Sequence, residues 1–234
     1  MPKANPKAAP ISAATDAVLD AALPHVPFDG WTDRTLQAAL ADSGTASSLG
    51  PVLFPRGALD LALAYHRRGD RRMAERLAAM NLGDLRFRDR VAAAIMARLD
   101  LVEDKELVRR GMAFFALPQN AVEGTKALWG TADAIWTALG DTSDDLNWYT
   151  KRATLSAVYS ATVLYWLGDD SPGHERTRDF LDRRIAEVME FEKFKASVRQ
   201  NPLGRVLTSP LRLLDGIRAP KRPDDLPGTL KDPA

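Results

Sequence analysis

Cysteine is absent from the 234-residue chain, and histidine occurs only three times. The lack of cysteine excludes disulfides, cysteine-based zinc sites, iron–sulfur clusters and thiol nucleophiles. His25, His66 and His174 lie far apart in the sequence and form no HExxH pattern. We therefore expect no catalytic residues, no metal and no cofactor.

Long apolar runs and an excess of charge of either sign are also missing. The longest apolar run, 158–167, is interrupted by Ser160 and Thr162 and falls far short of the ~20 residues that cross a bilayer. Lys and Arg number 32 and Asp and Glu 31, a balance that argues against wholesale binding to polyanions. The start shows no apolar signal region and no arginine before Arg34, so we expect a cytoplasmic protein.

Apolar residues recur at helical spacing almost throughout, which predicts an all-α fold. The expected segments are a flexible arm at 1–10, a helix-turn-helix-like module at 11–55, a larger helical ligand-binding and dimerisation domain at 56–197, an amphipathic helix at 198–218 and a disordered tail at 219–234. Within the larger domain, Ser143 is the expected N-cap of a helix over 144–167. Beyond Ala153 this helix is apolar nearly all round, so this chain or a partner subunit must cover it; we expect a homodimer.

The first fifty-odd residues resemble the N-terminal module of TetR-family regulators. The resemblance rests on the strings at 18–22, 30–32 and 36–40, on Gly44, and on Phe54-Pro55. Between Gly44 and Phe54 there is no Lys, Arg, His, Tyr, Asn or Gln, and Pro51 removes a backbone donor where a recognition helix should be straight. We therefore expect no nucleic-acid partner.

One basic cluster opposes that expectation, but Asp70 and Glu75 interrupt it, so it is interpreted as a solvated helix end, with a phospholipid or acidic-partner contact as the alternative. The cluster consists of Arg67, Arg68, Arg71, Arg72 and Arg76.

The stretch 144–152, DDLNWYTKR, is followed by LSAVY at 155–159, LGDDS at 167–171 and TRDFLDRRI at 177–185. This order resembles the ubiquinone-biosynthesis protein Coq nine family, and with the N-terminal module the resemblance covers residues 11–195. It implies a TetR-like homodimer that binds an isoprenoid lipid or ubiquinone precursor. It also implies a partner, the di-iron hydroxylase Coq seven, and a protein that is not itself an enzyme.

Methionine and aromatic side chains of the larger domain suit the wall of a lipid pocket as well as ordinary core. The candidate pocket residues are Met96, Met112, Phe115, Leu128, Trp129, Ile135, Trp136 and Tyr159.

Trp148 and Tyr149 are adjacent on the predicted helix and diverge by about 100°, so at least one should lie at the surface or rim. The family resemblance assigns these two residues, with Asp145 beside them, to the patch that meets the hydroxylase. The alternative is that Trp148 packs inside its own monomer.

The last predicted helix combines an apolar stripe with a cationic face, as in helices that lie in a membrane interface. The alternative is docking on this domain or on the sister subunit. With this helix, the expected location is peripheral, on the inner face of a bacterial cytoplasmic membrane. The stripe contains Leu203, Val206, Leu207, Leu211, Leu214 and Ile217, and the cationic residues are Arg205 and Arg212.

The expected function is that of a lipid-binding accessory protein of ubiquinone biosynthesis, which binds isoprenoid quinone intermediates at the membrane and presents them to Coq seven. Two alternatives remain open: a TetR-type ligand-responsive transcriptional repressor, and an enzyme with an unrecognised site.

Overall fold

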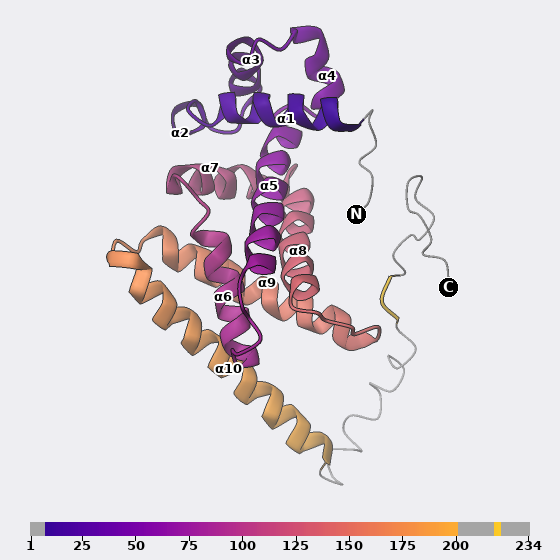
Figure 1. Ribbon diagram of the computed structural model, residues 1–234, viewed down its shortest axis with the longest axis vertical. Helices are drawn as coiled ribbons and strands as arrows, with labels where there is room; N and C mark the ends of the chain where they lie inside the picture. Colours follow the sequence, from indigo (N-terminus) through magenta and orange to yellow (C-terminus); the bar gives the residue numbers. More distant parts are fainter. Residues whose placement is uncertain (1–7, 201–217, 221–234) are drawn as a thin grey trace.

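The computed structural model describes residues 8–200 and 218–220, and the described residues contain helices and no strand, which confirms the all-α prediction (Figure 1). The helices are α1 (Ala8–Ala22), α2 (Val26–Asp29), α3 (Asp33–Asp42), η1 (Ser47–Leu49), α4 (Gly50–Leu53), α5 (Ala58–Ala79), α6 (Phe87–Leu99), α7 (Lys105–Phe115), α8 (Ala121–Ala138), α9 (Leu146–Leu167), η2 (Pro172–His174) and α10 (Glu175–Gln200).

Helices α1 to α4 form a small layer across one end of the long helix α5 (Figure 1). Thr32 is the N-cap of α3, and its hydroxyl accepts a hydrogen bond from the Thr35 amide at 3.2 Å. The layer has its own apolar core, which includes Val18, Leu36 and Leu40. It therefore folds as a module around side chains that the amphipathic pattern places inside.

The segment that replaces a recognition helix is short and consists of η1 and the single turn α4. A Cβ added at Gly50 would lie 2.8 Å from Leu40 Cδ1, so any other residue here would require the Leu40 side chain to shift. The side chains of Leu49 and Val52 are 45% and 63% exposed. This turn thus presents apolar groups to solvent.

Helix α5 belongs to two cores. Leu61 lies in the core of the N-terminal layer, whereas Met73 and Leu77 lie in a second core built by α5, α6, α8, α9 and α10. Buried Ile135 of α8 and Trp166 of α9 belong to this second core. Helix α5 therefore links the N-terminal layer to the larger bundle by packing in both cores.

Arginines of the basic cluster on α5 form ion pairs along its flank. The pairs are Arg68 with Asp20, Arg71 with Asp16, Arg72 with Glu103 and Arg76 with Asp100. Acidic groups of α1 and of the α6–α7 region thus neutralise much of this cluster.

The prediction that Ser143 caps α9 is wrong. Asp145 is the N-cap, its carboxylate accepts a hydrogen bond from the Asn147 amide at 2.9 Å, and the helix begins at Leu146. Ser143 instead donates to Asp141 at 2.9 Å and accepts from Lys151 Nζ at 2.6 Å. The Asp145 carboxylate, which lies directly before the first helical residue and at the positive end of the helix dipole, therefore takes the capping position.

Several predicted features lie partly or wholly outside the described residues. The flexible arm and the tail are of this kind, and so is the predicted membrane helix with its apolar stripe and its two cationic residues: Leu203, Arg205, Val206, Leu207, Leu211, Arg212, Leu214 and Ile217. Within the described ranges, no helix is both long and apolar enough to cross a bilayer. The same ranges contain no group of three or more acidic or histidine side chains placed to hold a metal.

Candidate functional site

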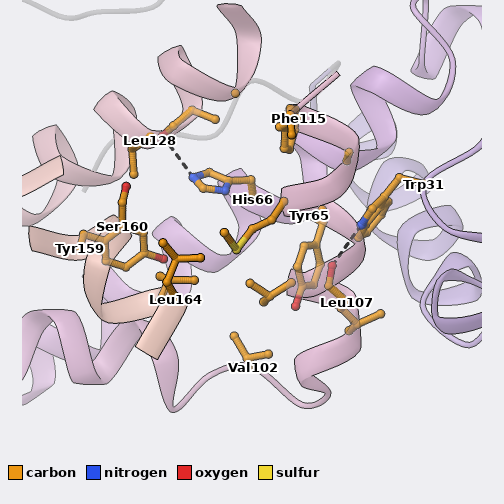
Figure 2. A pocket seen from close by; sticks show the side chains of 18 of the residues that line it. Trp31, Tyr65, His66, Val102, Leu107, Phe115, Leu128, Tyr159, Ser160 and Leu164 are labelled. Atoms are coloured by element: carbon orange, nitrogen blue, oxygen red, sulfur yellow. Dashed lines mark hydrogen bonds between the residues drawn. The ribbon is translucent and has the colours of Figure 1, made fainter. Parts of the chain in front are cut away.

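A cavity of about 380 Å³ lies between α5, the α6–α7 region, α8 and α9 (Figure 2). Its volume falls within the roughly 300–1,000 Å³ range of small-molecule sites. At one end, the Trp31 indole of the N-terminal layer donates a hydrogen bond to the Leu107 carbonyl at 3.2 Å. The walls are mostly apolar, and include Val102, Val108, Met112, Phe115, Leu128, Val163 and Leu164.

Polar groups of α5, α6 and α9 also line this cavity: Tyr65, His66, Arg98, Tyr159 and Ser160. Arg98 is only 5% exposed and reaches across to α5, where its Nε donates to Asp70 at 2.8 Å. A Cβ at Gly69 would lie 2.3 Å from the Arg98 guanidinium carbon. Glycine at this position therefore makes the buried Arg98–Asp70 pair possible.

Burial controls the protonation of the groups on this polar side. It lowers the pKa of His66, against the opposing influence of the Asp70 carboxylate. It raises the pKa of Tyr159, against the opposing influence of Arg98. At neutral pH the imidazole is therefore neutral and the phenol keeps its proton.

The candidate pocket residues separate into two groups. Met112, Phe115, Leu128 and Tyr159 line the cavity. The others lie elsewhere: Met96 and Ile135 are buried in the main core, Trp136 stacks on Phe87 with ring centroids 5.6 Å apart, and Trp129 joins the aromatic cluster described next.

Trp129 of α8 lies beside Trp148 and Tyr149 at the start of α9, and we call these three residues the aromatic cluster. The ring centroids of Trp129 and Trp148 are 5.8 Å apart, and those of Trp148 and Tyr149 are 4.8 Å apart with the rings nearly perpendicular. All three side chains are partly exposed. Edge-to-face contacts between large rings make a preorganised apolar surface of the kind that anchors protein interfaces.

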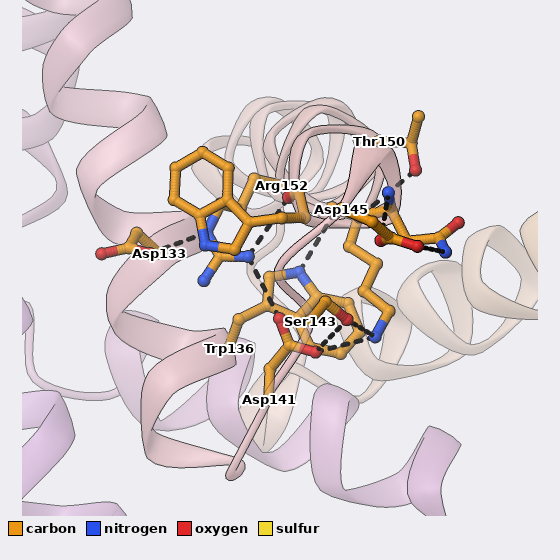
Figure 3. A network of polar contacts seen from close by, with 10 residues as sticks. Asp133, Trp136, Asp141, Ser143, Asp145, Thr150 and Arg152 are labelled. Atoms are coloured by element: carbon orange, nitrogen blue, oxygen red, sulfur yellow. Dashed lines mark hydrogen bonds and ion pairs between the residues drawn. The ribbon is translucent and has the colours of Figure 1, made fainter. Parts of the chain in front are cut away.

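A buried ionic network holds the start of α9 against α8 (Figure 3). Arg152 is 1% exposed and pairs with Asp133 at 2.6 Å and with Asp141 at 3.1 Å. Its guanidinium also lies 4.0 Å from the centre of the Trp148 ring and donates to the Trp148 carbonyl. Arg152 therefore fixes both the backbone and the ring of Trp148.

The segment after the predicted membrane helix returns to the same place. The Tyr149 hydroxyl donates to the Arg218 carbonyl at 3.1 Å, and the Ala219 amide donates to the Asp144 carbonyl at 2.8 Å. Asp145, the third residue of the predicted partner patch, caps the same helix. The aromatic cluster thus lies next to the point where residues 218–220 contact the bundle.

Comparison with known proteins bears on these features. The COQ9 family model matches residues 121–192, which span the aromatic cluster and the ionic network. The COQ9 protein of Drosophila melanogaster, named as a mitochondrial ubiquinone biosynthesis protein, is 32% identical over 196 residues, covering 82% of this chain and 60% of the relative. Human COQ9 is also 32% identical, over 183 residues, with 74% of this chain and 56% of the relative covered. The chain belongs to the COQ9 family.

A solved structure of a TetR transcriptional regulator from Nitrosomonas europaea superposes with a TM-score of 0.59 at 20% sequence identity, covering 74% of this chain and 96% of the regulator. This similarity confirms the TetR-like helical fold. At such low identity it carries no information on DNA binding, which is a property of side chains.

The predicted location on a bacterial cytoplasmic membrane is wrong, because the COQ9 relatives are named mitochondrial proteins. That prediction relied on the first residues of the sequence, in particular on the lack of arginine before Arg34. This chain spans about 60% of the length of the relatives that it matches. The composition of its first residues is therefore a poor guide to location.

The ionic network predicts how stability depends on pH. Burial pushes the pKa of Asp141 upward, but hydrogen bonds from Lys151, Ser143 and Arg152 outweigh it and bring the pKa to about 2. A carboxyl with a lowered pKa in the folded state stabilises the fold above its unfolded pKa of about 4 and loses this effect as the pH falls toward 2. We expect Asp141→Asn to cost about 2 kcal/mol at pH 7 and to flatten the pH dependence of unfolding by urea between pH 4 and 2.

Asp144→Asn is the matched control, because Asp144 is exposed and carries no such network. The free energy of unfolding of this variant should equal that of the wild type at pH 7 and between pH 4 and 2. Equal pH dependence of Asp141→Asn and the wild type would contradict the stabilising role of the network.

Proposed function

We propose that the protein acts in ubiquinone biosynthesis as a lipid-binding accessory protein, not as a catalyst. In this proposal it takes up an isoprenoid quinone precursor and presents it to the di-iron hydroxylase Coq seven. The observation that carries the proposal is a mostly apolar cavity of about 380 Å³ in a member of the COQ9 family.

The cavity wall suits a prenyl chain. Met112, Phe115 and Leu128 supply flexible and flat apolar surfaces on α7 and α8, against which branched hydrocarbon packs without needing hydrogen bonds. Transfer of such a chain from water to this wall is favourable by about 25 cal/mol per Å² of buried apolar area. Lining residues Ala116, Ala121 and Thr125 are exposed, so the cavity reaches the surface between α7 and α8.

The aromatic cluster is the proposed contact with Coq seven. It offers large, partly exposed rings whose positions are fixed by Arg152, and interface hot spots are enriched in such residues. Asp145 adds a carboxylate beside them. Since the rings are held in place before binding, little conformational entropy is lost when a partner covers them.

The proposal also includes contact with a membrane and with a second copy of the chain. The apolar stripe at 203–217 is proposed to lie in a membrane interface, and the next residues, 218–220, contact the bundle beside the aromatic cluster. This arrangement supports lipid delivery at the membrane. A homodimer is proposed to cover α9 where Leu164 is 59% exposed.

A substitution that fills the cavity should weaken lipid binding. We expect Leu128→Trp to weaken binding of a ubiquinone analogue with three isoprene units at least about tenfold, or about 1.4 kcal/mol, because the indole takes the space of the chain. Isothermal titration calorimetry measures this change.

Leu85→Trp introduces the same side chain at an exposed site away from the cavity and is the control. Its affinity for the analogue should match that of the wild type. If Leu128→Trp bound the analogue as tightly as Leu85→Trp, the ligand would not occupy this cavity.

Removing an interface anchor should weaken the complex with Coq seven. We expect Trp148→Ala to reduce affinity about 30-fold or more, consistent with a loss of about 2 kcal/mol for a hot-spot aromatic. Surface plasmon resonance with immobilised hydroxylase gives the dissociation constant.

Phe28→Ala is a matched control, since Phe28 is an aromatic residue that is 84% exposed on the N-terminal layer. It should leave the affinity for the hydroxylase unchanged. Equal losses in the two variants, or no loss in Trp148→Ala, would refute the aromatic cluster as the docking site.

A further inference from the structure

The polar side of the cavity is an ordered chain of hydrogen bonds whose donors can be assigned. His66 Nε2 lies 3.1 Å from the Ala127 carbonyl, which can only accept, so Nε2 carries the ring proton. The same nitrogen lies 2.7 Å from Thr131 Oγ1, and that hydroxyl donates to Asp70 at 3.0 Å. Because the imidazole is neutral, this assignment leaves Nδ1 of His66 as an acceptor on a residue that lines the cavity.

Three hydroxyl groups complete this side of the cavity. Tyr159 is 7% exposed, and within residues 8–200 and 218–220 its phenol has no hydrogen-bond partner. The hydroxyls of Tyr65 and Ser160 also lack a hydrogen-bond partner in these ranges and belong to cavity-lining residues (Figure 2). A hydroxyl that faces a cavity and makes no hydrogen bond to the described residues can bind a ligand there without giving up an existing contact.

The charge on this side is close to zero. Arg98 and His66 are the residues of the cavity lining that can carry a positive charge. The carboxylate of Asp70 balances Arg98 at 2.8 Å, and burial keeps His66 neutral. Phosphate groups need uncompensated cations, whereas carbonyl, hydroxyl and methoxy oxygens need single donors and acceptors. The site is thus suited to an uncharged, oxygen-rich head group.

We infer that Tyr159, Tyr65 and His66 form a head-group subsite that binds the ring oxygens of a neutral quinone, quinol or phenol. The inference rests on the proposed function and adds to it which end of the lipid this side of the cavity recognises. Tyr159 donates to a ring oxygen, and His66 Nδ1 accepts from a ring hydroxyl when the ring is reduced. The prenyl chain then packs against Met112, Phe115 and Leu128.

The test uses Tyr159→Phe, which removes one hydroxyl and keeps the ring. Tyr165→Phe makes the same change on the same helix, at a residue that does not line the cavity and stacks on Phe180. Calorimetry of the full chain compares three probes: a ubiquinone analogue with three isoprene units, farnesane as a hydrocarbon of the same chain length, and a lysophospholipid.

We expect Tyr159→Phe to bind the quinone about tenfold more weakly than the wild type and to bind farnesane equally well. Tyr165→Phe should match the wild type with both probes. The lysophospholipid should bind more weakly than the quinone to the wild type, because the subsite has no free cation. The melting temperature of Tyr159→Phe should equal or exceed that of the wild type, since no hydrogen bond within the described chain is lost.

Equal quinone affinity in Tyr159→Phe and the wild type would overturn the subsite while leaving the lipid-binding function intact. Tighter binding of the lysophospholipid than of the quinone would also overturn it. If neither the quinone nor farnesane bound the wild type, the proposed function itself would fail, and with it the subsite. A lowered melting temperature with equal loss for the quinone and farnesane would make Tyr159 a packing residue and refute its role in head-group recognition.

Discussion

The structure around the cavity depends on the carboxylate of Asp70. It accepts hydrogen bonds from Arg98 of α6 and Thr131 of α8 while it belongs to α5, so one side chain ties three helices together. The contact requires Gly69, because any side chain there would overlap the Arg98 guanidinium. Removal of one partner of such a buried pair typically costs about 3–5 kcal/mol, since the other charge is left unpaired in the low-dielectric interior of the protein. This constraint holds the helices in register and places polar groups at one side of an otherwise apolar cavity.

Most of the fold could be predicted from the sequence, because helical periodicity and caps are local properties. The helical spacing of apolar residues predicted the all-α fold, and Pro51 marked the segment where η1 and α4 stand in place of a recognition helix. The error at α9 has a local cause. Ser143 and Asp145 are both good caps in isolation, and only the position of Asp141 and Lys151 in space decides that Ser143 is engaged elsewhere.

The site was less accessible from the sequence. Met112 and Phe115 line the cavity, whereas Met96 and Ile135, which have the same apolar character, fill the main core, because helix position alone does not separate a cavity wall from a packed interior. Of the polar side, Tyr159 was predicted as a pocket residue, whereas Tyr65, His66, Arg98 and Ser160 were not. Arg98 follows a run of small apolar residues, and His66 lies beside a charged stretch of α5, so both have the appearance of ordinary surface residues until α5, α6 and α8 are brought together.

The central claim is that this cavity binds an isoprenoid quinone precursor. Native mass spectrometry of the protein purified from cells that make ubiquinone tests this claim most directly. The account predicts one prenylated quinone or phenol per chain, released at collision energies that leave the polypeptide intact. A chain that is consistently free of lipid, or one that carries only phospholipid, would contradict the account.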